Sequence, residues 1–229
     1  MKKKLVILTG AGMSAESGIS TFRDSGGLWD KYPVEQVATP EGFERDPELV
    51  LHFYNIRRKE LLGVEPNAGH YGLAELEKDF DVHIITQNID NLHERAGSTQ
   101  VMHLHGELMM ARSTADESLL YPLTSEKWEI KLGDLCEKGS QLRPHIVWFG
   151  EAVPMISEAA KLCEEANIFV IIGTSMNVYP AAGLLQYVKS NTPVYLIDPK
   201  EVHTYRSDIH FIQKGASEGV KELKQLLLT

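Results

Sequence analysis

Near the amino terminus, residues 5–9 read Leu5-Val-Ile-Leu-Thr9, and the chain continues as Gly10-Ala-Gly-Met-Ser-Ala-Glu-Ser-Gly-Ile-Ser-Thr-Phe-Arg23. An apolar run this short and this rich in branched residues predicts a buried strand. Gly10 and Gly12 let the backbone approach a ligand closely, and the residues after them can open a helix whose free N–H groups suit a phosphate. Together these features predict the nucleotide-binding half of an open α/β sheet.

The glycine spacing differs from the dehydrogenase fingerprint Gly-x-Gly-x-x-Gly, because the glycine that follows Gly12 is Gly18. This spacing disfavours an ordinary NAD dehydrogenase. A glycine-rich turn alone is weak evidence for a dinucleotide site, and Phe22 and Arg23 beyond it can equally be a core aromatic residue and a surface charge.

Length and composition exclude several classes of protein. The 229 residues fit one α/β domain, alone or with a smaller insertion. No segment approaches the roughly 18 uninterrupted apolar residues of a membrane span, and the basic start lacks the apolar region of a secretory signal. The net charge of −9 argues against non-specific nucleic-acid binding by bulk charge. Cys136 and Cys163 fit a reducing compartment, so we expect a cytoplasmic protein without nucleic-acid or membrane partners.

Short apolar runs alternate with amphipathic segments along the chain. Strands are predicted near residues 82–86, 101–106, 143–149, 168–172 and 193–197, and helices near 47–62, 67–78, 154–167, 180–190 and 216–228. Pro33, Pro40 and Pro47 indicate that residues 31–47 form a connection with short helical turns at most. Residues 107–142 are polar and weakly periodic, so we expect an irregular segment that leaves the sheet, with a candidate helix start at 125–128. The alternation predicts a parallel, three-layer α/β sheet.

Polar side chains follow the predicted strands at their carboxyl ends, where open α/β sheets bind ligands. Gln87, Asn88 and Asp90 follow the strand at 82–86, and His105 ends the next strand beside Gly106. Helix capping would account for Asn88 or Asp90 singly, and a lone histidine is more often structural. Their concentration at one strand end favours a ligand site.

Two further features have both a functional and a structural interpretation. Gly173-Thr174-Ser175 is a second glycine turn that suits phosphate or ribose, and Asp198 ends a strand where a carboxylate can hold a ribose hydroxyl. Tyr54 and Arg57 lie three apart on a predicted helix and share a face, which taken alone favours an exposed helix surface.

Taken together, these stretches resemble the signature motifs of the sirtuins, the NAD-dependent protein deacylases. The resemblance covers nearly the whole chain in order: residues 10–23, Thr86-Gln-Asn-Ile-Asp-Asn-Leu-His93, His105-Gly106, Pro144-His-Ile-Val-Trp-Phe-Gly-Glu151 and Gly173-Thr-Ser175. Ser20 stands where the family usually has proline.

The resemblance implies a Rossmann-type domain that binds NAD, with a smaller inserted domain and acyl-lysine peptide in the cleft between them. Residues 1–30, 72–105 and 144–229 would form the large domain, and 31–71 and 106–143 the small one. The products would be free lysine, nicotinamide and O-acyl-ADP-ribose. Asp198 would exclude a 2′-phosphate and so favour NAD over NADP.

The resemblance also implies residue roles. His105 would be the general base on the ribose hydroxyls, because an unperturbed histidine pKa of about 6.5 lies near working pH. Asn88, Asp90 and Arg23 would complete the catalytic set. The implied NAD contacts are Gly10, Ala11, Gly12, Ser14, Thr21, Phe22, Arg23, Trp29, Gln87, Asn88, Ile89, Asp90, His105, Gly173, Thr174, Ser175, Asp198 and Ala216.

Substrate contacts are implied for Tyr54, Arg57, Val147, Trp148, Phe149, Gly150, Glu151 and Val178. The Tyr54-x-x-Arg57 pair resembles that of sirtuins which remove succinyl and malonyl groups. The chemistry agrees, because a guanidinium can bind the distal carboxylate in a bidentate way beside a tyrosine hydroxyl. We expect some deacetylation as well, since the pocket still accepts a smaller acyl group.

One departure concerns zinc. Related sirtuins carry two Cys-x-x-Cys pairs in the second insertion, whereas residues 107–142 contain only Cys136. We therefore expect no metal site, and a small domain held by apolar packing around Leu119, Leu120, Tyr121 and Trp128.

Two rival functions use the same NAD site: an ADP-ribosyltransferase, and a sensor of NAD or acyl-ADP-ribose without catalysis. The presence of His105, Asn88 and Asp90 argues against lost catalysis, and Tyr54 and Arg57 argue for an acyl-lysine pocket. The absence of long tails predicts a monomer.

Overall fold

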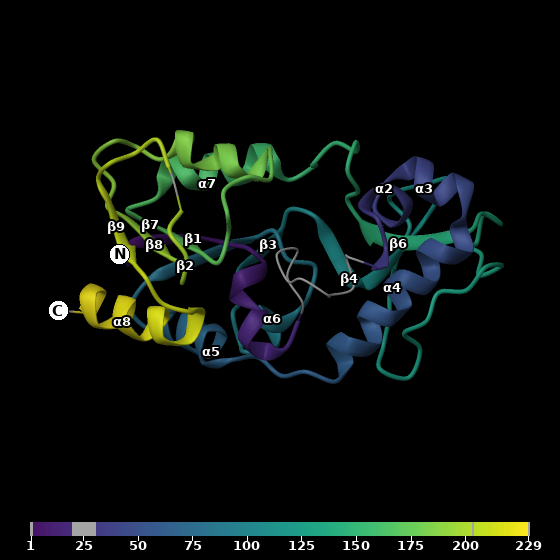
Figure 1. Cartoon of the computed structure of the whole chain (residues 1–229), viewed down its shortest axis with the longest axis horizontal. Helices are drawn as coiled ribbons and strands as arrows, with labels where there is room; N and C mark the ends of the chain where they lie inside the picture. Colours follow the sequence, from purple (N-terminus) through teal and green to yellow (C-terminus); the bar gives the residue numbers. More distant parts are fainter. Residues whose placement is uncertain (1, 20–30, 203, 229) are drawn as a thin grey trace.

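The computed structural model describes residues 2–19, 31–202 and 204–228. Figure 1 shows an elongated molecule with a parallel sheet and its helices at one end and a smaller group of helices and strands at the other. In these described ranges we find no helix with the length and apolarity that a bilayer crossing requires.

Six parallel strands form the main sheet of the described residues. They are β1 (Lys4–Thr9), β2 (Asp81–Thr86), β3 (Val101–His103), β7 (Ile168–Ile172), β8 (Val194–Ile197) and β9 (Ile209–Ile212), in the order β3-β2-β1-β7-β8-β9. The direction of strand addition reverses between β1 and β7. In doubly wound sheets, ligands bind at the carboxyl ends of the strands beside this switch point.

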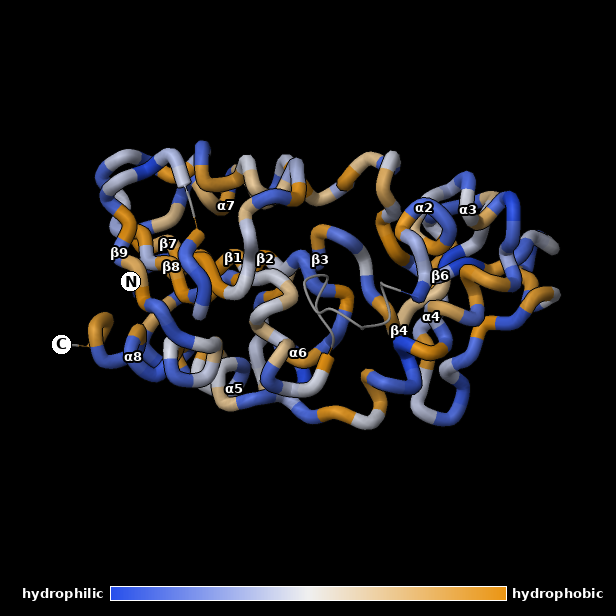
Figure 2. The backbone as a smooth tube through the Cα atoms, viewed as in Figure 1, coloured by the Kyte–Doolittle hydropathy of each residue, from blue (hydrophilic) through white to orange (hydrophobic). Residues whose placement is uncertain are grey.

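Helices cover both faces of the sheet, which confirms the predicted three-layer α/β fold. The helices α5 (Ala68–Leu76) and α8 (Ala216–Leu228) pack on one face, and α7 (Ile156–Glu165) and the 3₁₀ segment η3 (Ala181–Tyr187) on the other (Figure 1). Leu5 and Ile7 of β1 enter one core, and Val6 and Leu8 enter the other. Both faces of the sheet are therefore apolar, as the orange strands in Figure 2 show.

The smaller part contains α2 (Val34–Val37), α3 (Pro40–Arg45), α4 (Pro47–Leu62) and an antiparallel sheet of β5 (Leu120–Pro122), β4 (Gly106–Ser113) and β6 (Leu142–Ile146) in the order β5-β4-β6. As the sequence predicts, α4 begins with Pro47 in its first turn, and the Asp46 carboxylate accepts a hydrogen bond from Leu49 N.

The structure differs from the sequence-based expectation in several elements. Residues 107–142, expected to be irregular, supply strands β4 and β5, and residues 125–128 form no helix. The residues after Gly10 form two 3₁₀ turns, η1 (Ala11–Met13) and η2 (Ala15–Ser17), and the expected helix at 180–190 is the 3₁₀ segment η3. The strand β9 and the short helix α6 (Leu92–Arg95) were not expected. The strand predicted near residues 143–149 is β6, which pairs with β4 in the smaller sheet.

The apolar packing of the smaller sheet also differs from expectation. Its cluster consists of buried Leu51, Ala111 and Ile130 with half-buried Phe43, Tyr121, Leu123 and Leu142. Of the expected residues only Tyr121 belongs to it, and Leu120 is 42% exposed because it lies on the outer edge strand.

Candidate active site

A cavity of about 580 Å³ opens where the strands of the main sheet end and the smaller part begins. Its wall includes residues that directly follow β1, β2, β7 and β8, together with His105 two residues after β3. Residues of α4 and of the segment after β6 complete the wall. The cavity therefore occupies the switch point at which doubly wound sheets bind nucleotides.

Two glycine turns meet at the floor of this cavity. Gly10 N donates to Ile172 O at 2.9 Å, and Gly12 N donates to Gly173 O at 2.8 Å. A Cβ at Gly12 would lie 2.6 Å from Gly173 Cα, and Gly173 has a φ of +63°, so both positions require glycine. Bare backbone consequently lines the cavity at the place where a phosphate would approach.

A buried polar cluster stands beside these turns. The Ser14 hydroxyl donates to Asp90 Oδ2 at 2.9 Å and accepts from Asn88 Nδ2 at 3.1 Å. Leu92 N donates to Asp90 Oδ1 at 3.1 Å, and Asn88 Nδ2 also donates to Gly10 O at 3.0 Å. Burial raises the pKa of Asp90, while the bonds from Leu92 and Ser14 act in the opposite direction. These contacts fix the amide and the carboxylate in single orientations.

His105 is oriented as a base. Its Nδ1 lies 3.0 Å from Gln87 O, and because a carbonyl oxygen only accepts, Nδ1 carries the proton and Nε2 is the basic nitrogen. Burial lowers the pKa of His105, so the ring is neutral at physiological pH. It can therefore take a proton at Nε2.

His103 is placed differently, because β3 ends at this residue. Its Nδ1 lies 3.0 Å from Asn88 O and its Nε2 lies 2.8 Å from Glu94 Oε1. Burial lowers the pKa of His103, but the Glu94 carboxylate and the Asn88 carbonyl outweigh it and leave that pKa raised. His103 lies outside the cavity wall and holds the backbone of Asn88 in place.

Tyr54 and Arg57 both reach the cavity from α4. Tyr54 is 1% exposed, and its hydroxyl oxygen accepts a hydrogen bond from Trp148 Nε1 at 3.0 Å. Burial raises the pKa of Tyr54 to about 12, so the phenol keeps its hydrogen, which can be donated into the cavity. Half-buried Arg57 lies with its guanidinium carbon 5.8 Å from the Phe53 ring centroid. Burial lowers the pKa of Arg57, but a guanidinium remains charged in proteins.

Residues 147–151, which follow β6, form another part of the cavity wall. Val147 N donates to His105 O at 2.9 Å, and Phe149 N donates to Ala38 O at 3.0 Å, which links this segment to both parts of the molecule. Trp148 is buried whereas Phe149 is exposed at the cavity rim.

The cavity brings together most of the residues that the sequence singled out: Gly10, Ala11, Gly12, Ser14, Gln87, Asn88, Ile89, Asp90, His105, Gly173, Thr174, Ser175, Asp198, Tyr54, Arg57, Val147, Trp148, Phe149, Gly150, Glu151 and Val178. Ala216 is not among the lining residues; it is 4% exposed in the first turn of α8, and its neighbour Gly215 lines the cavity. Thr21, Phe22, Arg23 and Trp29 lie outside the described residues.

Sequence reasoning missed several wall residues. Glu60 and Leu61 lie three and four positions after Arg57, so helical spacing alone could have identified them. Lys200 lies two residues after Asp198, and its backbone N donates to Asp198 Oδ1 at 2.9 Å. Ala38 and Leu108 reach the cavity through tertiary packing, for which no local signal exists.

Among the described residues, no group of three histidine, cysteine, aspartate or glutamate side chains is arranged to hold a metal ion. The Cys136 thiol lies buried and donates to Ser113 Oγ at 3.3 Å. The expected absence of zinc stays a prediction.

Comparison with known proteins gives consistent results. The model of the Sir2 family matches residues 10–180. The chain is 66% identical over 230 residues to an NAD-dependent protein deacylase of Bacteroides thetaiotaomicron, an alignment that covers 99% of this chain and 98% of that protein. A solved structure of a variant Sir2 homologue with ADP-ribose is similar at a TM-score of 0.89 and 39% identity, covering 99% of this chain and 94% of that one. A Sir2 homologue in complex with NAD is similar at a TM-score of 0.86 and 40% identity, covering 99% and 91%.

Proposed function

The chain belongs to the Sir2 family of NAD-dependent protein deacylases, and we propose that the acyl groups it prefers to remove from lysine are acidic ones, succinyl or malonyl. The observation that carries this proposal is the position of Tyr54 and Arg57. The phenol of Tyr54 and the guanidinium of Arg57 lie on one face of α4, and both residues line the same cavity as His105.

The residues at the carboxyl ends of β1, β2 and β7 fit NAD. The close-packed backbone at Gly12 and Gly173 leaves room for a pyrophosphate, and fixed donors and acceptors at Asn88, Asp90 and Ser14 suit a ribose and a carboxamide. When bound, NAD supplies the ribose carbon that the acyl oxygen attacks as nicotinamide leaves. The products are free lysine, nicotinamide and O-acyl-ADP-ribose.

In this proposal His105 moves the proton. Its Nε2 takes the proton of a ribose hydroxyl, which makes that oxygen a nucleophile toward the acyl carbon. The Gln87 carbonyl stabilises the resulting imidazolium, because it accepts the hydrogen bond from Nδ1 of the ring.

The acyl chain enters on the side of Tyr54. The hydroxyl donates its hydrogen to one oxygen of the distal carboxylate, because its own oxygen is already occupied by Trp148. Arg57 supplies a positive charge for the distal carboxylate. A local cation is needed because the net charge of the protein is −9 and would otherwise repel an anionic acyl group. An acetyl group lacks the carboxylate but still fits the space, so we expect weaker deacetylation.

Further assignments rest on the same proposal. The large domain (1–30, 72–105 and 144–229) would hold NAD, and acylated protein segments would bind between it and the small domain (31–71 and 106–143). We propose a monomer, and a cytoplasmic location that the free thiols of Cys136 and Cys163 support.

Arg57→Met tests the acyl preference, because methionine keeps the volume and removes the cation. We expect the KM for a succinyl-lysine peptide to rise by about 10-fold or more and the KM for the matched acetyl peptide to stay within about twofold. Lys59→Met, which removes an exposed cation two residues further along α4, is the control. Equal effects of Arg57→Met on both peptides would refute the proposal.

A further inference from the structure

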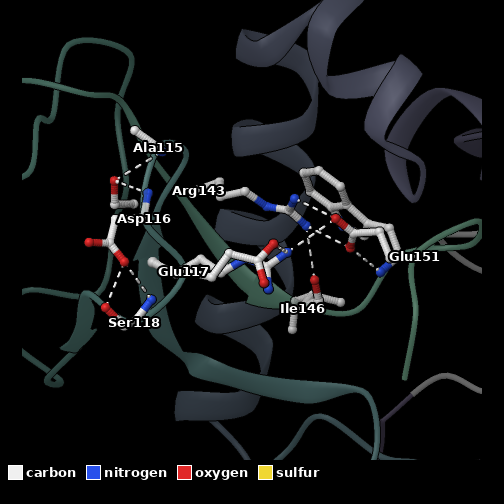
Figure 3. Close-up of polar contacts among 10 residues, drawn as sticks. Ala115, Asp116, Glu117, Ser118, Arg143, Ile146 and Glu151 are labelled. Atoms are coloured by element: carbon white, nitrogen blue, oxygen red, sulfur yellow. Dashed lines mark hydrogen bonds and ion pairs between the residues drawn. The ribbon is translucent and has the colours of Figure 1, made fainter. Parts of the chain in front are cut away.

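Two buried arginines meet the half-buried carboxylate of Glu151 at the cavity wall, and exposed Glu117 lies 3.7 Å from one of them, Arg112. Arg112 of β4 and Arg143 of β6 are directly opposite one another in the antiparallel pairing, and they are 5% and 8% exposed. Glu151 lies between the two cations. Arg143 Nη1 donates to Glu151 Oε1 at 2.7 Å and Nη2 donates to Oε2 at 3.0 Å, while Arg112 Nη2 donates to Oε1 at 3.1 Å. Figure 3 shows Arg143 facing Glu151 and the Ile146 carbonyl.

Glu151 ties this charge group to the cavity wall. Its Oε2 also accepts a hydrogen bond from Trp148 N at 2.7 Å, and Glu151 N donates to Trp148 O at 3.0 Å. Gly150 between them has a φ of +91°, which a tight turn requires. Both carboxylate oxygens are thus committed to holding the 148–151 turn against the smaller sheet.

Arg143 makes a second contact with the same turn. Its guanidinium carbon lies 3.4 Å from the centroid of the Trp148 ring, so the flat cation stacks on the indole, and Nη2 also donates to Ile146 O at 2.9 Å. Trp148 Nε1 in turn donates to the Tyr54 hydroxyl. A continuous series of contacts therefore runs from Glu151 through Arg143 and Trp148 to Tyr54.

We propose that Arg143 is a positioning residue for the acyl-lysine substrate, fixing the Trp148 indole so that Tyr54 presents its hydrogen to the acyl group. The proposal rests on the proposed function for the placement of the acyl chain beside Tyr54. An indole N–H only donates, so the orientation of Trp148 decides which way the Tyr54 hydroxyl points.

A purely stabilising role would explain these contacts less well. Buried ion pairs are weak sources of stability, because desolvation of the charges offsets their attraction. Here the planar guanidinium does what a lysine ammonium cannot, since it stacks on one face of the Trp148 ring while its two Nη atoms bond the Glu151 carboxylate and the Ile146 carbonyl. The geometry therefore points to precise placement of the turn.

The test is Arg143→Lys, which keeps the charge and loses the stacking. We expect the KM for the acyl-lysine peptide to rise by about tenfold, with kcat and the Kd for NAD changed by less than about twofold. Lys138→Gln is the control, because it removes the 2.6 Å ion pair with Asp116 in the same small part without touching Trp148 or Glu151. A KM no higher than that of Lys138→Gln, or an equal loss of NAD affinity, would overturn the proposal.

Trp148→Phe provides a second variant if Arg143→Lys fails to fold. It keeps an aromatic ring for Arg143 and removes only the donor to Tyr54, so the KM for the acyl peptide should again rise, and an unchanged KM would contradict the proposal. Succinyl and acetyl peptides are both measured. A wild-type preference for acetyl would refute the acidic-acyl proposal alone, since Arg143 would still be judged by the KM for the acetyl peptide.

Discussion

His105 shows how a single backbone contact decides the chemistry of a residue. Because Nδ1 faces the Gln87 carbonyl, the basic nitrogen is Nε2, and burial lowers the pKa of the ring. The neutral ring is the active form of a general base. Acidification protonates His105 and should therefore remove activity only below pH ~6.5, the ordinary pKa of histidine.

We predict that kcat/KM is constant above pH ~6.5 and falls on the acid side of that value. The measurement is a pH profile of nicotinamide release.

The variant His105→Ala should turn over about 100-fold or more slowly than the wild-type protein while it still binds NAD. An acid limb centred above pH 7, or full activity in His105→Ala, would remove His105 from its assigned role.

The residues of the site were more predictable than their surroundings. Glycine at positions 10, 12 and 173 and polar side chains at strand ends are local features, and the cavity contains them. The charge group of Arg112, Arg143 and Glu151 was not predicted. It depends on the pairing of β4 with β6, which places Arg112 opposite Arg143, a residue far away in the sequence.

At the scale of elements, α5 begins with a capping box in which a histidine takes part. Asn67 Oδ1 accepts from Gly69 N at 2.9 Å, and His70 Nδ1 accepts from Asn67 N at 3.2 Å, so His70 fills the place that glutamate or glutamine usually takes in a capping box. His70 is fully buried, and burial lowers its pKa to about 4. The folded helix therefore keeps this ring neutral.

The burial of neutral His70 predicts how the free energy of unfolding depends on pH. Between pH ~6.5 and ~4 the unfolded chain binds a proton at residue 70 that the folded chain does not, so the free energy of unfolding falls as pH falls, by about 3 kcal/mol from this group. Urea denaturation across this range measures the effect. His70→Gln should flatten the slope and the exposed control His52→Gln should not. An unchanged slope in His70→Gln would contradict the assignment.

Elements with local signals were predicted well. Buried runs of branched residues identified β1, β2, β7 and β8, and Asp46-Pro47 and Asn67 identified the starts of α4 and α5. Strands β4 and β5 were missed although β6 was predicted, because β4 (Gly-Glu-Leu-Met-Met-Ala-Arg-Ser) contains no β-branched residue and its pairing with distant residues decides its structure.

At the scale of the whole molecule, the proposed preference for acidic acyl groups depends on residues from both parts of the structure. The main sheet presents His105 and the glycine turns, and the smaller part presents Tyr54, Arg57 and the sheet behind Trp148. Neither part has the complete cavity alone. An anionic acyl group is attracted by a local cation within a protein whose overall charge is negative.

The most direct measurement is NAD-dependent nicotinamide release by the wild-type protein with matched succinyl-lysine and acetyl-lysine peptides. We predict a kcat/KM for the succinyl peptide that exceeds that for the acetyl peptide by about tenfold or more, because a charged hydrogen-bonded pair forms only with the former. Equal values, or a preference for acetyl, would contradict the assignment of Tyr54 and Arg57 as readers of an acidic acyl group.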